Sequence, residues 1–120
     1  MKLAISSSGA ALDSAVDQRF GRASSFVIYE SETGAFTVID NEQNLNAAQG
    51  AGIQSAQHVV NAGAHVLITG HTGPKAFKVL QAGKVAIYLS GPDTVAGAVA
   101  AWKAGTLKQI TEADVEGHWV

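Results

Sequence analysis

Hydrophobic and polar positions divide the chain into short strand-like runs and longer helical stretches. Runs rich in β-branched and aromatic residues predict strands over residues 2–6, 25–31, 35–41, 65–69 and 84–89. Apolar residues at helical spacing predict three helices, over residues 50–62, from Pro74 to a stop at Gly83, and from about residue 93 to 104. Residues from 106 onward have no clear periodicity, so no element is expected there.

The order of these elements predicts an α/β fold built on one sheet. Residues 32–34 (Glu-Thr-Gly) form a turn signal, so the second and third strands make a hairpin. The later strands alternate with helices, which favours parallel pairing through right-handed crossovers. The economical arrangement is a ribonuclease-H-like, mixed five-stranded sheet of order 3-2-1-4-5, with strand 2 antiparallel and helices on its faces. We expect residues 1–110 to form a single domain, followed by a tail over 111–120.

This topology brings four loop segments to one edge of the sheet. The loops after strands 1 and 4 are expected to leave toward opposite sides, and open α/β sheets usually bind ligands in the crevice between such loops. The segments expected there are residues 6–9 (Ser-Ser-Ser-Gly), 19–22 (Arg-Phe-Gly-Arg), 50–53 (Gly-Ala-Gly-Ile) and 70–75 (Gly-His-Thr-Gly-Pro-Lys). All three predicted helices begin at this edge, so unpaired N–H groups and positive dipole ends should face it.

Composition narrows the functional classes. Of the 120 residues, 47% are apolar and 15% are charged, with eight Lys and Arg against ten Asp and Glu. A packed core is therefore expected, without a general attraction to nucleic acid or membranes. The absence of cysteine excludes disulfides, thiolate catalysis and Cys-ligated metal sites. No segment has the length of a signal-peptide core or a transmembrane helix, so we expect a cytoplasmic protein.

Familiar catalytic and nucleotide-binding motifs do not fit this edge. A dinucleotide fingerprint needs a strand directly before it and an acid about 20 residues later, whereas residues 50–55 (GAGIQS) follow a polar stretch and Gly70 stands where the acid belongs. The first strand lacks the carboxylates of a two-metal nuclease, and Ser7, His71 and Asp93 have no nucleophile elbow around them. The glycines therefore either let a loop enter a helix closely or expose amides to an anion.

Charged residues at the predicted edge favour the anion. Arg19 and Arg22 flank a Phe-Gly pair, either as solvated charges around a buried Phe20 or as two guanidinium groups over an anion. Lys75 lies in a first helical turn, where a cation opposes the helix dipole, and this misfit favours an anion-binding role. His71 directly follows a strand at the crevice and is a candidate for a functional contact, whereas the other histidines read as structural or lie in the tail. The residues together predict a pocket for a small, multiply charged anion.

Three stretches resemble the dinitrogenase iron–molybdenum cofactor biosynthesis family: RFGRASSFVIY (19–29), the run from GAGIQ to VAIY (50–88), and VAGAVAAWKAGTLKQI (95–110). The family includes NifX-like carriers, the C-terminal part of NifB, and a small orange protein that holds a molybdenum–copper sulfide cluster. The resemblance implies a ribonuclease-H-like fold and a non-enzymatic carrier of a preassembled metal–sulfur cluster, with a protein partner in cluster delivery. Such a cluster brings its own sulfides and negative charge, so Arg, Lys and amide groups can hold it without cysteine.

The motif positions match the family with two changes. Residues 20–22 match its His-Phe-Gly-Arg stretch, and Arg19 stands where many members have His. Residues 50–54 match the glycine-rich helix entry, and residues 70–77 match Gly-x-x-Gly-Pro-Asn-Ala-Phe, with Lys75 in place of the Asn. Two added cations favour the orange-protein branch and a molybdenum–copper sulfide cluster, with an iron–molybdenum cofactor precursor as the alternative.

The predicted cluster-binding residues come from all four loop segments. They are Ser7, Ser8, Arg19, Phe20, Gly21, Arg22, Gly50, Gly52, Gly70, His71, Thr72, Gly73 and Lys75, and His71 is the candidate for contact with a metal. A sensor module for a small anion or a nucleotide phosphate would use the same crevice. An interaction module without a ligand would instead dock a partner through Trp119 or the last helix.

Overall fold

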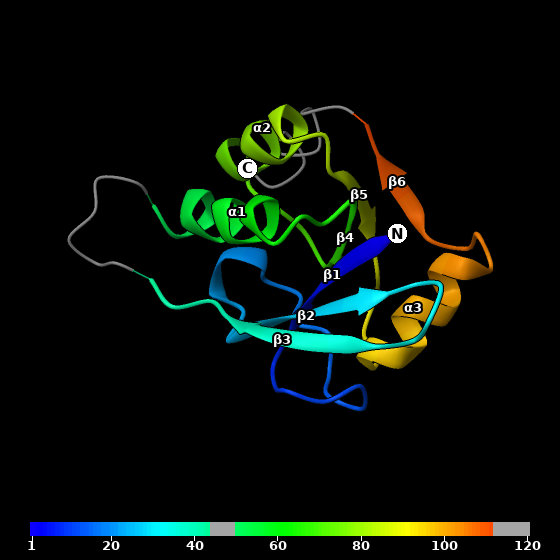
Figure 1. Ribbon diagram of the computed structural model, residues 1–120. Coiled ribbons are helices and arrows are strands. Elements are labelled where there is room, and N and C mark those ends of the chain that lie inside the picture. Colours follow the sequence, from blue (N-terminus) through cyan, green and yellow to red (C-terminus); the bar gives the residue numbers. More distant parts are fainter. Residues whose placement is uncertain (44–49, 112–120) are drawn as a thin grey trace.

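The computed structural model describes residues 1–43 and 50–111. A six-stranded mixed sheet forms its centre, in the order β3-β2-β1-β4-β5-β6 (Figure 1). Its strands are β1 (Lys2–Ser7), β2 (Ser25–Glu30), β3 (Phe36–Asp40), β4 (Val66–Thr69), β5 (Ala86–Leu89) and β6 (Lys108–Ile110). β4 pairs parallel with β1 and β5, while β1 with β2, β2 with β3, and β5 with β6 pair antiparallel.

The predicted order of the first five strands is confirmed, including the antiparallel strand 2. The prediction of a five-stranded sheet with no element after residue 106 is wrong, because β6 pairs with β5 and places Gln109 opposite Tyr88. A strand of three residues is too short to show a period in the sequence, and its pairing with β5 is what defines it. The predicted tail, with Trp119 in it, lies outside the described residues from position 112 onward.

The helices divide between the two faces of the sheet. α1 (Ala51–Asn61) and α2 (Pro74–Ala82) cover one face, and α3 (Val95–Lys103) covers the other (Figure 1). A short 3-10 turn, η1 (Phe20–Arg22), packs against α1. In the described part of the chain no helix combines the length and apolar character needed to cross a bilayer.

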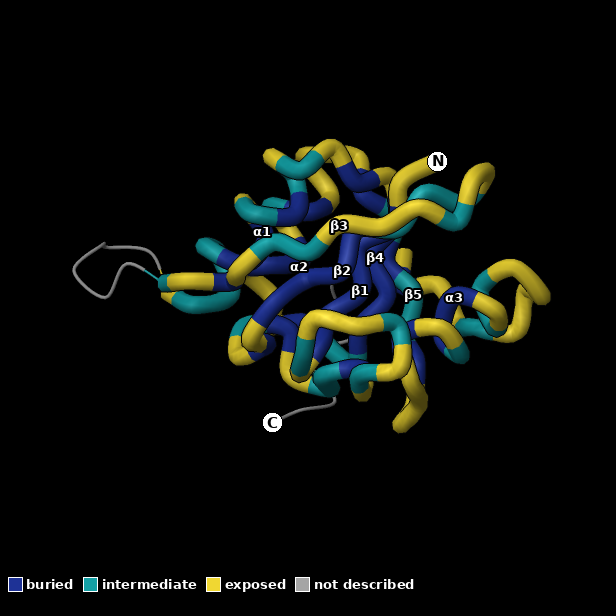
Figure 2. The backbone as a smooth tube through the Cα atoms, turned by 60° about the horizontal axis from the view of Figure 1, so that its bottom comes forward, coloured by how far each residue is buried: buried dark blue, intermediate teal, exposed yellow. Residues whose placement is uncertain are grey.

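Two hydrophobic cores lie on the two faces because side chains alternate along each strand. β1 sends Ala4 into the core under α1 and α2, and Leu3 and Ile5 into the core under α3. The central strands β1 and β4 are buried almost throughout, whereas the edge strand β3 is largely exposed (Figure 2). The sheet therefore acts as a rigid base whose strand ends position the loops.

The segment between β1 and β2 crosses from one face of the sheet to the other. Val16 is buried in the core under α3, and Phe20, four residues later, is buried in the core under α1 and α2. The loop after β1 therefore first leaves toward the face of α3, and the loop after β4 leads to α2 on the other face, as expected. The sequence did not indicate the later crossing, which brings the two loops together in a short parallel β-bridge between Arg19 and His71.

Candidate functional site

Three of the four predicted segments form one loop cluster, defined here as residues 18–22, 50–52 and 70–75. The first and third segments are joined by backbone hydrogen bonds, from His71 N–H to Gln18 C=O at 3.1 Å and from Phe20 N–H to His71 C=O at 3.3 Å. Phe20 is buried and its ring lies 5.4 Å from that of Phe26, which anchors the cluster to the sheet. Phe20 therefore fixes the loop cluster to the hydrophobic core, while the charged residues next to Phe20 lie at the surface.

Glycines let the three segments approach one another. A Cβ on Gly70 would collide with the Gln18 backbone, so no larger residue fits there. A Cβ on Gly21 would lie 3.2 Å from the Gly52 backbone nitrogen, which is tight. In contrast, a Cβ on Gly50 or Gly73 would meet no atom within 4 Å. The first two glycines are explained by packing, whereas the space around the other two is free for a ligand.

Gly50 and Gly73 are the N-caps of α1 and α2, and neither helix has a side-chain cap. Among the described residues, no loop carbonyl accepts from the first-turn amides of these helices either. Unpaired first-turn amides, together with the helix dipole, make such helix ends suitable for binding anions.

α3 corrects the expectation that all three helix ends are free. Thr94 caps the helix, because its hydroxyl accepts from Gly97 N–H at 3.0 Å. The Val95 and Ala96 amides donate to loop carbonyls at 2.9 and 2.8 Å, so the first turn of α3 is satisfied. α3 also lies on the opposite face of the sheet from the loop cluster.

Arg19, Arg22 and Lys75 are all exposed around the loop cluster. The Arg19 side chain is 71% exposed, and its Nε lies 3.7 Å from Asp17 Oδ1. Arg22 and Lys75 have no ion-pair partner in the described part of the chain. The cluster therefore presents cationic side chains beside uncapped helix ends.

Thr72 and His71 differ in how they are held. The Thr72 side chain is buried, and its hydroxyl has no hydrogen-bond partner among residues 1–43 and 50–111. A buried hydroxyl without a partner is costly, and one at a binding site is often explained by a ligand or an ordered water. The His71 backbone is fixed by the bridge to Arg19, and the residue is half-buried.

Ser7 and Ser8 are the predicted residues that the structure places away from the loop cluster. Ser7 is buried, and its hydroxyl donates to Gly9 C=O at 2.8 Å. The Ser8 hydroxyl donates to Ala15 C=O at 3.2 Å. Both hydroxyls thus serve the turn after β1, and a role for them in ligand binding stays a prediction.

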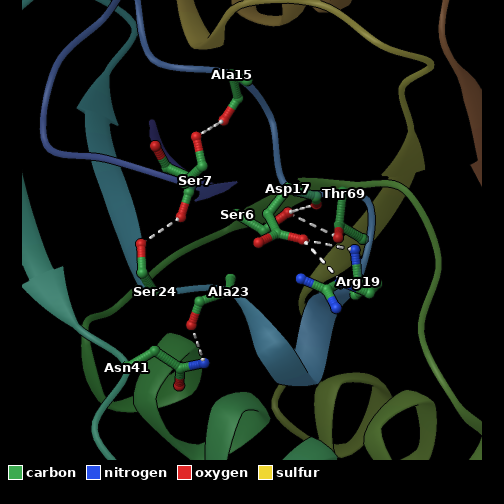
Figure 3. A network of polar contacts seen from close by, with 10 residues as sticks. Ser6, Ser7, Ala15, Asp17, Arg19, Ala23, Ser24, Asn41 and Thr69 are labelled. Carbon is green, nitrogen blue, oxygen red and sulfur yellow. Dashed lines mark hydrogen bonds and ion pairs between the residues drawn. The ribbon is translucent and has the colours of Figure 1, made fainter.

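Ser6, Asp17 and Thr69 were not among the predicted cluster-binding residues, and they form a hydrogen-bonded group beside Arg19 (Figure 3). The Ser6 hydroxyl donates to Asp17 C=O at 2.7 Å and lies 2.8 Å from the Thr69 hydroxyl oxygen. Asp17 Oδ1 accepts from Arg19 N–H at 2.9 Å. Alternation along β1 could have indicated Ser6, because it shares a face with Ala4 and so with the core under α1 and α2.

A second polar network ties the end of β3 to α1. Asn41 Oδ1 accepts from the Ser55 hydroxyl at 3.0 Å and contacts His58 Nδ1 at 2.8 Å, so the ring carries its proton on Nδ1. Asn41 Nδ2 donates to Ala23 C=O at 2.9 Å, next to η1 (Figure 3). The network holds η1, β3 and α1 together, in agreement with the structural role expected of His58.

The donor set of this site suits an anion better than a bare metal ion. Among residues 1–43 and 50–111, no three His, Asp or Glu side chains come together as a metal-binding group, and the chain has no cysteine. The groups that do converge are cations, amides and one buried hydroxyl. They can neutralise negative charge and donate hydrogen bonds to a ligand that already holds its metals.

Comparison with known proteins gives matches that span nearly the whole chain. The apo form of the orange protein from Desulfovibrio gigas is 38% identical with a TM-score of 0.85, over 92% of each chain. A Thermotoga protein that belongs to the DUF35 family is 35% identical with a TM-score of 0.79, over 92% of this chain and 94% of that one. A Methanocaldococcus jannaschii protein with a TM-score of 0.70 is 21% identical, over 93% and 96% of the two chains, and supports the fold alone.

No curated protein matches the sequence at a significant level. The sequence profile of the family described as "Dinitrogenase iron-molybdenum cofactor" matches residues 1–105, which include every strand but β6 and the whole loop cluster. Together with the 38% identity to the orange protein over most of both chains, this match shows that the chain belongs to the dinitrogenase iron–molybdenum cofactor family.

Proposed function

We propose that this chain binds and carries a preassembled, anionic metal–sulfur cluster and catalyses no reaction of its own. The observation that carries the proposal is the loop cluster, where three exposed cations lie beside two helix ends that no described residue caps. Family membership supports a role in cofactor biosynthesis. The metal–sulfur cluster is the cargo in this proposal, so the protein needs to hold it reversibly and to release it to a partner.

Each group of the loop cluster has a separate task in this proposal. Arg19, Arg22 and Lys75 neutralise the charge of the bound metal–sulfur cluster, and the first-turn amides of α1 and α2 donate hydrogen bonds to its sulfides. The Thr72 hydroxyl is a further donor, and the His71 ring is the contact for a metal. Because the cluster supplies its own sulfides, the absence of cysteine presents no obstacle.

The finer proposal is a molybdenum–copper sulfide cluster. It rests on Arg19 and Lys75, which stand at motif positions where many family members have the neutral residues His and Asn. Two added positive charges favour a compact, highly charged thiomolybdate-type anion over a cluster ligated by histidine. An iron–molybdenum cofactor precursor is the alternative cargo.

The test is an anaerobic titration of the purified protein with tetrathiomolybdate, with and without copper, followed by desalting, metal analysis and visible spectroscopy. Stoichiometric retention of molybdenum with new charge-transfer bands is the expected result. The triple variant Arg19→Gln, Arg22→Gln, Lys75→Gln should bind roughly 100-fold more weakly, because three charge-assisted contacts are lost.

A matched triple variant controls for net charge. Lys84→Gln, Lys103→Gln and Lys108→Gln remove the same charge from exposed positions outside the loop cluster, and binding should stay within about two-fold of wild type. Equal weakening in both triple variants would show that net charge alone acts and that the proposed site is wrong. If wild type retains no molybdenum with or without copper, the iron–molybdenum precursor is tested next, and thermal stabilisation by nucleotides then tests the phosphate-sensor alternative.

A further inference from the structure

Asp17 places an acidic side chain directly beside the cations of the loop cluster. Its Oδ1 accepts from the Arg19 amide at 2.9 Å and lies 3.7 Å from the Arg19 Nε (Figure 3). The Asp17 side chain is 13% exposed, whereas that of Arg19 is 71% exposed. The Asp17 side chain is therefore largely enclosed by the protein, whereas the Arg19 side chain lies in solvent.

The position of Asp17 is fixed from the centre of the sheet. Its amide donates to Ser6 C=O at 2.8 Å, and its carbonyl accepts from the Ser6 hydroxyl at 2.7 Å. That hydroxyl lies 2.8 Å from the hydroxyl oxygen of Thr69, at the end of β4. The carboxylate is thus attached to two buried central strands, while the Arg19 guanidinium lies on a long side chain that can turn in solvent.

We propose that Asp17 is a built-in counter-anion that holds Arg19 until the incoming anion takes its place. This inference rests on the proposed function and specifies how the site releases its cargo. An ion pair with one exposed partner is weak and exchanges readily, so a dianion can draw Arg19 away. The carboxylate stays where it is and competes with the bound anion for Arg19, which lowers affinity and speeds release.

The simpler role for Asp17 is to cap the turn through the bond from the Arg19 amide. The variant Asp17→Asn separates the two roles, because an amide oxygen accepts the same backbone bond while the charge is gone. Asp13→Asn is the matched control, since Asp13 is exposed in the same inter-strand segment and its loss changes net charge equally. A turn-capping role alone predicts the same affinity for both variants.

The experiment measures tetrathiomolybdate affinity and dissociation rate for wild type, Asp17→Asn and Asp13→Asn. Asp17→Asn should bind about three-fold to ten-fold more tightly and release more slowly, while Asp13→Asn stays near wild type. In an Arg19→Gln background most of this gain should vanish, because Asp17 acts through Arg19. Asp17→Asn binding no tighter than Asp13→Asn overturns the inference.

A second measurement keeps the inference separate from the proposed function. Sulfate is titrated against the three proteins, and the Arg19 Nε–H resonance is followed by NMR. Arg19 should shift at lower sulfate concentration in Asp17→Asn than in wild type or Asp13→Asn. If wild type fails to retain tetrathiomolybdate but this order holds, the cargo assignment fails and the counter-anion stands. An identical sulfate response in all three proteins rejects the counter-anion role.

Discussion

Two regions at the same edge of the sheet differ in whether their polar groups find hydrogen-bond partners. At the serine-rich end, defined as residues 7–16 with the start of α3, hydroxyls and carbonyls satisfy the neighbouring polar groups, and Thr94 caps the helix. At the loop cluster, α1 and α2 begin at glycines without a side-chain cap, and the Thr72 hydroxyl has no hydrogen-bond partner in the part of the chain that the structure describes. The difference teaches that many serines after a strand do not make a ligand site, whereas exposed cations beside donors that no described residue satisfies favour one.

The largest effect is expected where the first and third segments of the loop cluster pack closely against each other. Gly70→Ala should lower the free energy of unfolding by roughly 1–3 kcal/mol, because its Cβ would occupy the space of the Gln18 backbone. Gly73→Ala is the control in the same loop, where no atom lies within 4 Å, and it should change stability by less than about 1 kcal/mol in either direction, because the lower entropy of the unfolded chain opposes the weaker N-cap that Ala provides. Urea denaturation measures both. Equal effects would contradict the packing argument.

Helix capping gives the next largest contrast between the two regions. Thr94→Ala should lower the free energy of unfolding by about 1 kcal/mol, since the Gly97 amide loses its acceptor. Gly73→Ser should change it by only a few tenths of a kcal/mol. It should nevertheless weaken anion binding, because the new hydroxyl would compete for the first-turn amides of α2. Unchanged tetrathiomolybdate binding in Gly73→Ser would remove those amides from the proposed site.

Two buried threonines at the end of β4 and just beyond it allow a matched comparison. Thr72→Val should raise the free energy of unfolding by up to about 1 kcal/mol, because it removes a buried hydroxyl that no described residue satisfies. Thr69→Val should lower it by about 1 kcal/mol, because the Ser6 hydroxyl loses a buried contact. Thermal denaturation monitored by circular dichroism measures both. If Thr72→Val also destabilises the protein, its hydroxyl is satisfied in solution and the argument for it fails.

The smallest effect is expected at the opposite end of β1, remote from both regions. The N-terminal amine hydrogen-bonds to Glu30 and Glu32, which raises its pKa above the ordinary 8.0, and the same amine lowers the pKa of Glu30 below 4.5. This stabilisation is complete between pH 4.5 and 8.0. It is lost as pH rises through the folded pKa of the amine, and as pH falls through that of Glu30.

A pH series of thermal denaturation curves tests this window. Glu30→Gln should flatten the decline of stability on both sides of this window, whereas Glu42→Gln, a change at an exposed acid outside this ion pair, should leave the decline as in wild type. A profile for Glu30→Gln that is superimposable on wild type would show that the pair contributes nothing measurable, as is true of many exposed ion pairs.

The sequence was sufficient for most of the fold. Strand-like runs, helical spacing, Pro74 and Gly83 gave five strands, three helices and the order of the sheet, because these patterns depend on neighbours a few residues apart. β6 was missed because a strand of three residues carries too little pattern of its own. It exists through its pairing with β5, more than fifteen residues away in the chain.

Part of the candidate site followed from the same logic, and part did not. The sequence determined which residue types follow each strand, and so it indicated cations, glycines and an absence of cysteine at one edge of the sheet. Only the tertiary structure decided that residues 18–22 cross the edge to meet residue 71, that α3 is capped on the far face, and that the hydroxyl of Ser6 rather than that of Ser7 holds Asp17. These outcomes depend on which face a side chain takes and on which distant backbone satisfies it, and a one-residue change of register reverses the first. Local patterns specify the elements, but the pairing of polar groups across the fold specifies which of them remain free to bind.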